Sequence, residues 1–382
     1  MRITGIHIYQ CDVPLKFAFH SPQAFRSRAE SVLVEVEFDN GVSGYGESAP
    51  RNYVTGETCS SVIGILRKEF TGLLLEKCIE RVEDIDDLLR RLEHCCIDNG
   101  IPAYHSALGA IDIALLDALG KVQHKPIYEF LGPAVRTEIP HAVPIPFLPP
   151  EKIKRSLSIL KDIRFKSVKV LMGQDEEENR QRVSWIRKLF GSEMDIRVEA
   201  NGKWTPDQAI SNLRKIENFR ISAVEQPVPR GDCEGMRKVR STLGISVIAD
   251  ESMYSLSDAR DLIECGCCDI LNIKISKCGG LLRSKQIADY ARQKGVLCQL
   301  GSHVGEADVL SAAGVQFAMV LSNLTYFEGP SNLLLGKFRK DGRLIKENER
   351  ARGPLHGLGV AVRGDMLTKI CSLGVDRHEE YT

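Results

Sequence analysis

Ionisable side chains recur at a nearly constant interval through the middle of the chain. They are Lys169, Glu199, Glu225, Asp250, Lys274, His303 and Glu328, and successive members lie 24 to 30 residues apart. This interval is close to the length of one strand followed by one helix and its loops. If each unit adds its strand to one sheet, these side chains form a ring at the carboxyl edge of that sheet.

Three consecutive members of this series are carboxylates, Glu199, Glu225 and Asp250. Carboxylates that lie close together in a site of low dielectric cannot all stay ionised without a cation among them. A set of oxygen ligands favours Mg²⁺, for which Mn²⁺ can substitute. A salt bridge at the rim would explain any one of these carboxylates, but it explains three successive strand ends poorly.

Two lysines flank the carboxylates, Lys169 before them and Lys274 after them. In a closed barrel they are expected to face each other over the metal, where a lysine can act as a base near neutral pH. The chemistry that follows is removal of the proton α to the carboxylate of a small-molecule substrate, with the metal stabilising the enediolate. For either lysine alone, the alternative is a tether that holds a carboxylate.

The elements that must position these groups are short apolar runs that alternate with amphipathic helical segments. The runs are residues 141–147, 167–172, 195–201, 223–227, 246–252, 269–276, 297–303 and 324–330. Eight parallel strands joined by helices predict an α/β fold, a closed (β/α)8 TIM barrel with its catalytic groups at the carboxyl ends of the strands. The alternative is an open doubly wound sheet, but the glycine-rich turn of dinucleotide-binding folds does not follow the first run.

The regions before and after the barrel differ from it. Residues 1–130 combine alternating runs typical of antiparallel strands with helical patterns over 60–92 and 104–123, which predicts an α+β capping domain. Residues 131–340 form the predicted barrel domain, which carries the metal and acid/base residues. Residues 341–382 are expected to return to the capping domain.

Composition narrows the range of partners. The 382 residues include 51 basic and 51 acidic side chains, without a cluster of Lys and Arg, so a nucleic-acid or anionic-membrane partner is not expected. No apolar run reaches the length of about 18 residues that a membrane span needs, and no signal peptide is evident, so a cytoplasmic protein is expected.

The twelve cysteines are expected to be reduced. Cys265 and Cys268 have metal-ligand spacing but lack a second pair nearby, which favours buried thiols.

The motifs of the chain resemble those of the enolase superfamily, in particular the muconate lactonizing enzyme subgroup with its muconate cycloisomerases, dipeptide epimerases and o-succinylbenzoate synthases. They are VEANGKW at 198–204, VEQP at 224–227, ADES at 249–252, NIKISKCGG at 272–280 and GLGV at 357–360. The resemblance implies an enolase-type barrel with a capping domain and Mg²⁺ bound by the three carboxylates. It also implies that Lys169 and Lys274 are an acid/base pair on opposite faces of the substrate carbon.

The chain departs from this subgroup at three places. Members usually have Asp where this chain has Glu199, and their Lys-x-Lys pattern on the second strand reads Ser167-Val168-Lys169 here. The Asp-x-Asp pair of dipeptide epimerases on the eighth strand is replaced by Phe327-Glu328-Gly329-Pro330. The last difference argues against a dipeptide as the substrate.

Residues expected to contact the substrate lie at the barrel rim and in the capping loops 17–25 and 51–58. They are Asn201, Glu251, His303, Glu328, Tyr53 and Arg51. A histidine at the end of strand seven is the base in the related mandelate racemase subgroup, where an aspartate on strand six pairs with it. Because strand six carries Lys274 here, His303 is expected to donate a hydrogen bond to the substrate or to serve the structure.

The function that follows is an Mg²⁺-dependent isomerase, an epimerase, racemase or cycloisomerase. A lyase of the same fold is the alternative, either similar to o-succinylbenzoate synthase or an acid dehydratase, with one lysine as base and the other steadying the enolate. A barrel that only binds its ligand is a third reading, which the departures at Glu199 and Ser167 motivate. The resemblance also implies a homo-oligomer.

Overall fold

A computed structural model describes residues 1–20, 25–145, 147, 165–329, 331, 356–360, 362, 367–374 and 377–381. Several expectations fall partly outside these ranges. They concern residues 21–24 of the first capping loop, Pro330, and residues 341–355 of the carboxyl-terminal segment.

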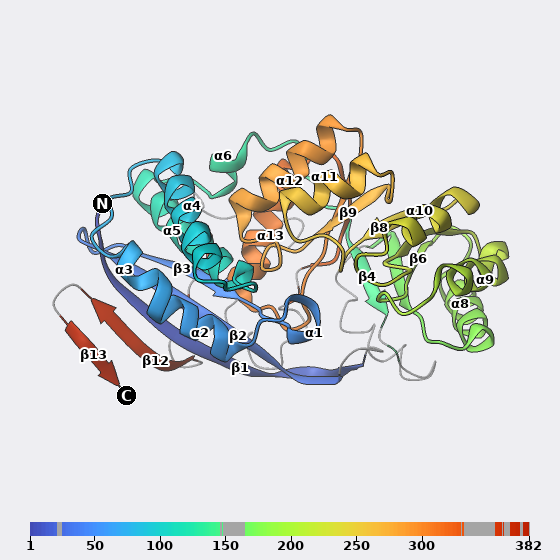
Figure 1. Ribbon diagram of the computed structural model, residues 1–382, viewed down its shortest axis with the longest axis horizontal. Coiled ribbons are helices and arrows are strands. Elements are labelled where there is room, and N and C mark those ends of the chain that lie inside the picture. Colours follow the sequence, from blue (N-terminus) through green and yellow to red (C-terminus); the bar gives the residue numbers. More distant parts are fainter. Residues whose placement is uncertain are drawn as a thin grey trace.

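The amino-terminal domain is built on an antiparallel sheet. Its strands are β1 (Ile3–His20), β2 (Phe25–Phe38), β3 (Ser43–Ser48), β12 (Leu367–Gly374) and β13 (Arg377–Tyr381), in the order β13-β12-β1-β2-β3. The pairing of β12 with β1 brings the end of the chain back to the capping domain (Figure 1). The backbone N–H of Leu358 also donates to Asp117 at 2.8 Å, which fixes the segment before β12 to the same domain.

The helical segments of this domain follow β3. They are α1 (Asn52–Thr55), α2 (Cys59–Ile65), the π-helical turn η1 (Leu66–Phe70), α3 (Thr71–Leu74), α4 (Val82–Asp98), α5 (His105–Gln123) and α6 (Tyr128–Leu131). Of these, α2 and α5 pack directly on the sheet. The helical pattern over 60–92 corresponds to α2, η1, α3 and α4, and α4 begins at Val82, where Asp84 accepts hydrogen bonds from the backbone N–H groups of Glu80 and Arg81. The predicted helix over 104–123 is confirmed by α5.

Helix α5 packs very closely against β3. A Cβ atom added at Gly46 would lie 1.7 Å from the backbone oxygen of Ala110, and one at Gly44 would lie 2.0 Å from that of Ala114. Two glycines on one face of the strand therefore allow a contact that no larger residue permits.

The second sheet is the predicted barrel. Its strands are β4 (Ala142–Ile145), β5 (Ser167–Leu171), β6 (Asp195–Glu199), β7 (Ile221–Glu225), β8 (Ser246–Ala249), β9 (Ile270–Ile273), β10 (Leu297–Leu300) and β11 (Leu324–Phe327). Every neighbouring pair in the order β4 to β11 is parallel. A parallel bridge between His141 and Phe327 joins the two ends, so the eight strands close on themselves.

Helices follow the strands and lie outside the barrel (Figure 1). They are α8 (Glu176–Phe190), α9 (Pro206–Ile216) with the short 3₁₀ turn η3 (Glu217–Phe219), α10 (Cys233–Thr242), α11 (Leu256–Glu264), α12 (Leu281–Gln293) and α13 (Asp308–Val320). The (β/α)8 architecture with an antiparallel capping sheet is the fold that the sequence predicted.

Buried carboxylates of the capping domain hold two of the barrel helices. Asp112 of α5 accepts from the backbone N–H groups of Leu281 and Leu282 at the start of α12. Glu47 of β3 accepts from Ala307 at 2.7 Å and from Leu310 at 3.0 Å at the start of α13. The first N–H groups of a helix lack partners within it, so these carboxylates satisfy them from another domain.

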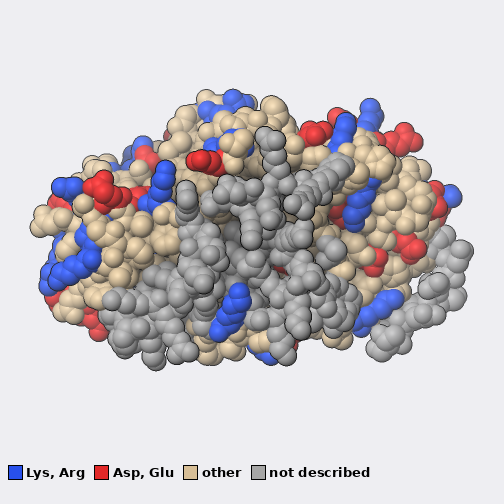
Figure 2. All heavy atoms as spheres, turned by 180° about the vertical axis from the view of Figure 1, so that it is seen from behind, with Lys and Arg blue, Asp and Glu red and all other residues tan. Residues whose placement is uncertain are grey.

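The described surface agrees with the balanced composition. Figure 2 shows blue and red side chains interspersed over the part of the rear face that is not grey. Within the described residues, no helix combines the length and the hydrophobicity needed to span a membrane.

Candidate active site

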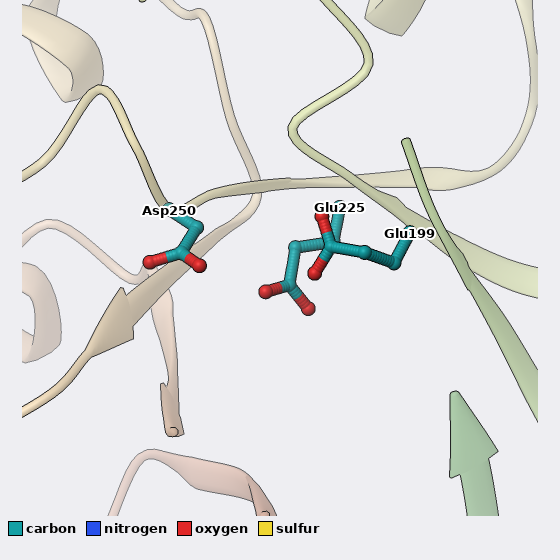
Figure 3. Close-up of side chains that lie close together, drawn as sticks. All are labelled: Glu199, Glu225 and Asp250. Atoms are coloured by element: carbon teal, nitrogen blue, oxygen red, sulfur yellow. The ribbon is translucent and has the colours of Figure 1, made fainter. Parts of the chain in front are cut away.

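Three carboxylates converge at the carboxyl ends of neighbouring barrel strands. Glu199 ends β6, Glu225 ends β7, and Asp250 directly follows β8. Each offers a ligand oxygen, and these oxygens all lie within 4.8 Å of one another. The three residues are 2%, 0% and 1% exposed, and Figure 3 shows their carboxylates turned toward a common space. We call these residues the acidic triad.

The two predicted lysines contact the triad from different sides. The Lys169 ammonium lies 3.0 Å from carboxylate oxygens of both Glu199 and Glu225. The Lys274 ammonium lies 2.5 Å from Asp250 Oδ2. Lys169 stands within β5, whereas Lys274 directly follows β9.

A third lysine also binds the triad. Lys277 Nζ donates to Asp250 Oδ1 at 2.7 Å and to the backbone oxygens of Asp250 and Asn272. Lys277 was not among the predicted site residues, although its place three residues after Lys274 in a recognised motif could have drawn attention to it.

Burial and charge move the pKa values within the triad in opposite directions. For Glu199, burial and the charge of Glu225 raise the pKa of the carboxyl well above its ordinary value. Burial acts the same way on Asp250, but Lys274 and Lys277 outweigh it and lower the pKa. Three buried carboxylates that converge on one space, with only oxygen ligands, fit a hard divalent cation such as Mg²⁺.

Nearby carboxylates raise the pKa values of both lysines. Burial disfavours the charge of Lys169, but the carboxylates of Glu225, Glu328 and Glu199 outweigh it and raise its pKa well above the ordinary value. For Lys274 burial is likewise outweighed, mainly by Asp250, and the pKa is raised.

A layer of polar side chains inside the barrel supports the triad. Asn272 Nδ2 donates to Glu225 Oε1 at 2.8 Å, and Gln299 Nε2 donates to Glu225 Oε2 at 2.9 Å. The guanidinium of Arg197 contacts Glu328 Oε1 at 3.0 Å and lies 4.0 Å from the centre of the Tyr326 ring. Asn272, Gln299 and Arg197 were missed from the sequence. Polar residues at inward positions of otherwise apolar strands were the available signal.

Asn201 and Glu251, two of the predicted substrate contacts, lie beside the triad. The backbone N–H of Asn201 donates to Glu199 Oε1 at 3.0 Å, and its side chain donates to Glu251 Oε1 at 3.4 Å. Asn201 has a φ of 51°, in the left-handed region that Asn tolerates better than most residues. Glu328, a third predicted contact, is buried in the barrel with its carboxylate 2.9 Å from Lys169 Nζ.

His303 joins the barrel to the capping domain. Its Nδ1 lies 2.8 Å from the backbone oxygen of Ala49, so Nδ1 carries the hydrogen. Its Nε2 is buried without a partner among the described residues. Burial lowers the pKa of His303 well below its ordinary value, and the charges of Lys274 and Arg51 lower it further. The contact with Ala49 is structural, which is one of the two roles that the sequence left open for His303.

The capping-domain residues Arg51 and Tyr53 differ in their surroundings. Arg51 is fully buried, and its guanidinium donates to the backbone oxygens of Glu30, Pro50 and Val304. It therefore connects the capping domain to the loop after β10. Tyr53 is 41% exposed, with the Arg26 guanidinium 5.7 Å from its ring centre.

Comparisons with known proteins agree with this geometry. Residues 4–132 match the family "Mandelate racemase / muconate lactonizing enzyme, N-terminal domain", and residues 153–366 match the family "Enolase C-terminal domain-like". An N-succinyl-L-Arg/Lys racemase of Bacillus cereus is 30% identical over 375 residues, which covers 97% of this chain and 98% of the racemase.

Solved structures are similar over nearly the whole chain. A dipeptide epimerase of Enterococcus faecalis, complexed with Mg and the dipeptide L-Leu-L-Tyr, has a TM-score of 0.85 at 27% identity and covers 94% of this chain and 99% of its own. A muconate lactonizing enzyme of Pseudomonas fluorescens has a TM-score of 0.87 at 23% identity over 96% and 98%, which supports the fold. The chain therefore belongs to the muconate lactonizing enzyme subgroup of the enolase superfamily and is an isomerase of that superfamily.

Proposed function

We propose that this isomerase removes and returns the proton α to the carboxylate of a small-molecule substrate in an Mg²⁺-dependent reaction. An epimerase and a racemase remove and return this proton, whereas a cycloisomerase gains or loses it as a ring closes or opens. The observation that carries the proposal is the buried acidic triad with the ammonium of Lys274 at its edge.

Glu199, Glu225 and Asp250 would hold the cation. An Mg²⁺ ion bound there would supply positive charge to the substrate carboxylate, where negative charge develops as the α-proton leaves. The chain itself then has to move a proton at the adjacent carbon. Lys274 Nζ, at the carboxyl end of its strand, is the group best placed to accept and return it.

Lys169 differs from Lys274 in its surroundings. The hypothesis from the sequence has both lysines acting on opposite faces of the substrate carbon. Three carboxylates surround the Lys169 ammonium, those of Glu199, Glu225 and Glu328. We therefore propose that Lys169 holds these carboxylates in place and that Lys274 is the base.

The relatives suggest the substrate class. One is named for N-succinylated arginine and lysine, and another was solved with a dipeptide. Both kinds of molecule have an α-carbon between an acylated nitrogen and a carboxylate. We propose an N-acylated amino acid or a dipeptide as the first compounds to test, although Glu328 replaces the Asp-x-Asp pair that dipeptide epimerases carry.

The test is proton NMR in D₂O with the purified protein. N-succinyl-lysine, N-succinyl-arginine and Ala-Glu dipeptides are supplied in both configurations at the α-carbon, with Mg²⁺ or with EDTA. Loss of the α-proton signal with Mg²⁺ but not with EDTA supports the proposal. Exchange that is unaffected by EDTA would exclude the metal-dependent mechanism.

The same spectra examine the lyase alternative. An elimination would form a new alkene signal, whereas an isomerase leaves the composition of the substrate unchanged.

A homo-oligomer remains a proposal from the family resemblance. Light scattering after gel filtration measures the molar mass of the assembly and so its number of subunits.

A further inference from the structure

The interior of the barrel is arranged in layers, and Lys169 belongs to a deep one. In barrels of this kind the four side chains of one layer come from alternate strands. Lys169 on β5, Glu225 on β7, Asn272 on β9 and Glu328 on β11 fit that rule. Their contacts join them directly, at 3.0 Å from Lys169 to Glu225, 2.9 Å from Lys169 to Glu328, and 2.8 Å from Asn272 to Glu225.

The next layer toward the mouth contains Leu171 and Lys274. Each lies two residues beyond a member of the deep layer on the same strand, and two residues along a strand return to the same face. Leu171 follows Lys169, and Lys274 follows Asn272. Leu171 also pairs in register with Glu199 of the acidic triad.

The contacts of its neighbours along β5 indicate that Leu171 faces the interior. Val168 and Val170 pack in the main hydrophobic core. Ser167 Oγ accepts from Arg197 Nε inside the barrel, and Lys169 contacts the interior carboxylates. Leu171 continues the inward series that begins with Ser167.

Leu171 and Lys274 therefore face each other across the mouth. Strands β5 and β9 are four steps apart in a closed sheet of eight, so they stand on opposite sides. Leu171 is 5% exposed and Lys274 is 9% exposed. A substrate carbon held beside the triad between them has an ammonium-bearing side chain on one side and an aliphatic side chain on the other.

We infer that proton transfer occurs from the Lys274 face alone, with Leu171 covering the opposite face of the substrate carbon. This inference rests on the proposed function and assigns its stereochemistry. The neutral amine of Lys274 takes the α-proton to become an ammonium, and the same ammonium returns it. Leucine cannot donate or accept a proton, so a probe that cannot cyclise exchanges its α-proton and keeps its configuration. Of the three isomerisations that the proposed function includes, the inference therefore keeps the cycloisomerisation and excludes epimerisation and racemisation. Lys169 is a positioning residue beneath this layer.

The experiment measures exchange and inversion together in the full-length protein with Mg²⁺. The probes are N-succinyl-lysine and the Ala-Glu dipeptide in both configurations at the α-carbon, followed by NMR for deuterium uptake and by chiral chromatography for inversion. We expect one configuration to exchange its α-proton about 100-fold faster than it inverts, since a positioned acid or base contributes about that factor. Inversion as fast as exchange would overturn the inference.

Substitutions at the mouth add a second readout. Leu171→Lys is expected to raise the rate of inversion, because it places an amine opposite Lys274, whereas the apolar control Leu171→Met is not. Lys169→Met is expected to retain the preference for one configuration, even where its overall rate falls. A loss of that preference in Lys169→Met would show that Lys169 reaches the carbon and would contradict the inference.

The outcomes separate the two proposals. No Mg²⁺-dependent exchange of any probe by the unsubstituted protein counts against the proposed function, and the stereochemical inference then fails with it. Exchange with rapid inversion keeps the proposed function and overturns only the role of Leu171.

Discussion

Four buried carboxylates and four buried cationic side chains meet inside the barrel. The carboxylates are Glu199, Glu225, Asp250 and Glu328, and the cations are Lys169, Lys274, Lys277 and Arg197. Contacts of 2.5–3.0 Å pair each of them with a group of opposite charge. Because a buried ion is costly unless it is paired, removal of one member leaves an uncompensated charge. A substitution at one of these residues is therefore expected to change the charge balance inside the barrel as well as the proposed proton transfer.

Lys274→Ala is expected to lower the rate of α-proton exchange by about 10²–10⁴-fold, since it removes the proposed base. The measurement is deuterium uptake by NMR, with circular dichroism as the check on folding. Lys238→Ala is a matched control, because this lysine is exposed and pairs only with exposed Asp207 among the described residues. Exchange at the unsubstituted rate in Lys274→Ala would rule out Lys274 as the base.

Glu225→Gln is expected to weaken Mg²⁺ binding by at least about tenfold. Loss of a residue that only supports a metal ligand already weakens the affinity by about that factor, and Glu225 is a proposed ligand itself. Isothermal titration with Mg²⁺ measures the affinity. The control is Glu177→Gln, the same substitution at an exposed position of α8. Unchanged affinity in Glu225→Gln would contradict the assignment of the triad as the metal site.

At the scale of elements, backbone N–H groups at the starts of two barrel helices donate hydrogen bonds to buried carboxylates of the capping domain. Asp112 on α5 receives the first N–H groups of α12, and Glu47 on β3 receives those of α13. Helix α12 follows the strand that leads to Lys274. The capping domain therefore fixes the starts of two helices that follow barrel strands of the site.

Asp112→Ala is expected to lower the free energy of unfolding by about 1–3 kcal/mol, because buried N–H groups at the start of α12 lose their acceptor. Urea denaturation followed by circular dichroism gives this value. Asp98→Ala, at the exposed end of α4, serves as the control and should change stability little. Equal stability of the two variants would show that water or another group replaces the carboxylate.

At the scale of the whole molecule, buried carboxyls make stability depend on pH. Burial raises the pKa of Glu47, Glu57 and Asp112 to about 7 each. The folded state therefore binds more protons than the unfolded state between about pH 4 and 7. Their contribution to stability is fully present below the unfolded pKa and is lost as the pH rises toward 7.

Replacing these carboxyls by amides should flatten that dependence. The triple variant Glu47→Gln, Glu57→Gln, Asp112→Asn is expected to lose less stability than the unsubstituted protein between pH 5 and 7. Urea midpoints at several pH values in this range, with the metal absent, provide the comparison. Parallel curves for the two proteins would mean that these groups do not carry the pH dependence.

Much of the fold and of the site follows from local sequence patterns. Strand and helix alternation in residues 139–336 is a local property, so it predicted the closed barrel. A polar residue at the end of an apolar strand is also a pattern of neighbouring residues, and this pattern led to Glu199, Glu225 and Asp250. The exact start of α4 at Val82 does not follow from periodicity, because it depends on a few hydrogen bonds that Asp84 accepts from the backbone.

The sequence by itself determined which strand each ionisable residue occupies and which side of the barrel wall it faces, because side chains alternate along a strand. Only the tertiary structure decided their height within the barrel. Strand tilt and register set that height, and they place Lys169 beneath the mouth and Leu171 across from Lys274. Tertiary packing likewise placed the Arg51 guanidinium among backbone carbonyls from distant segments, since such contacts leave no local pattern.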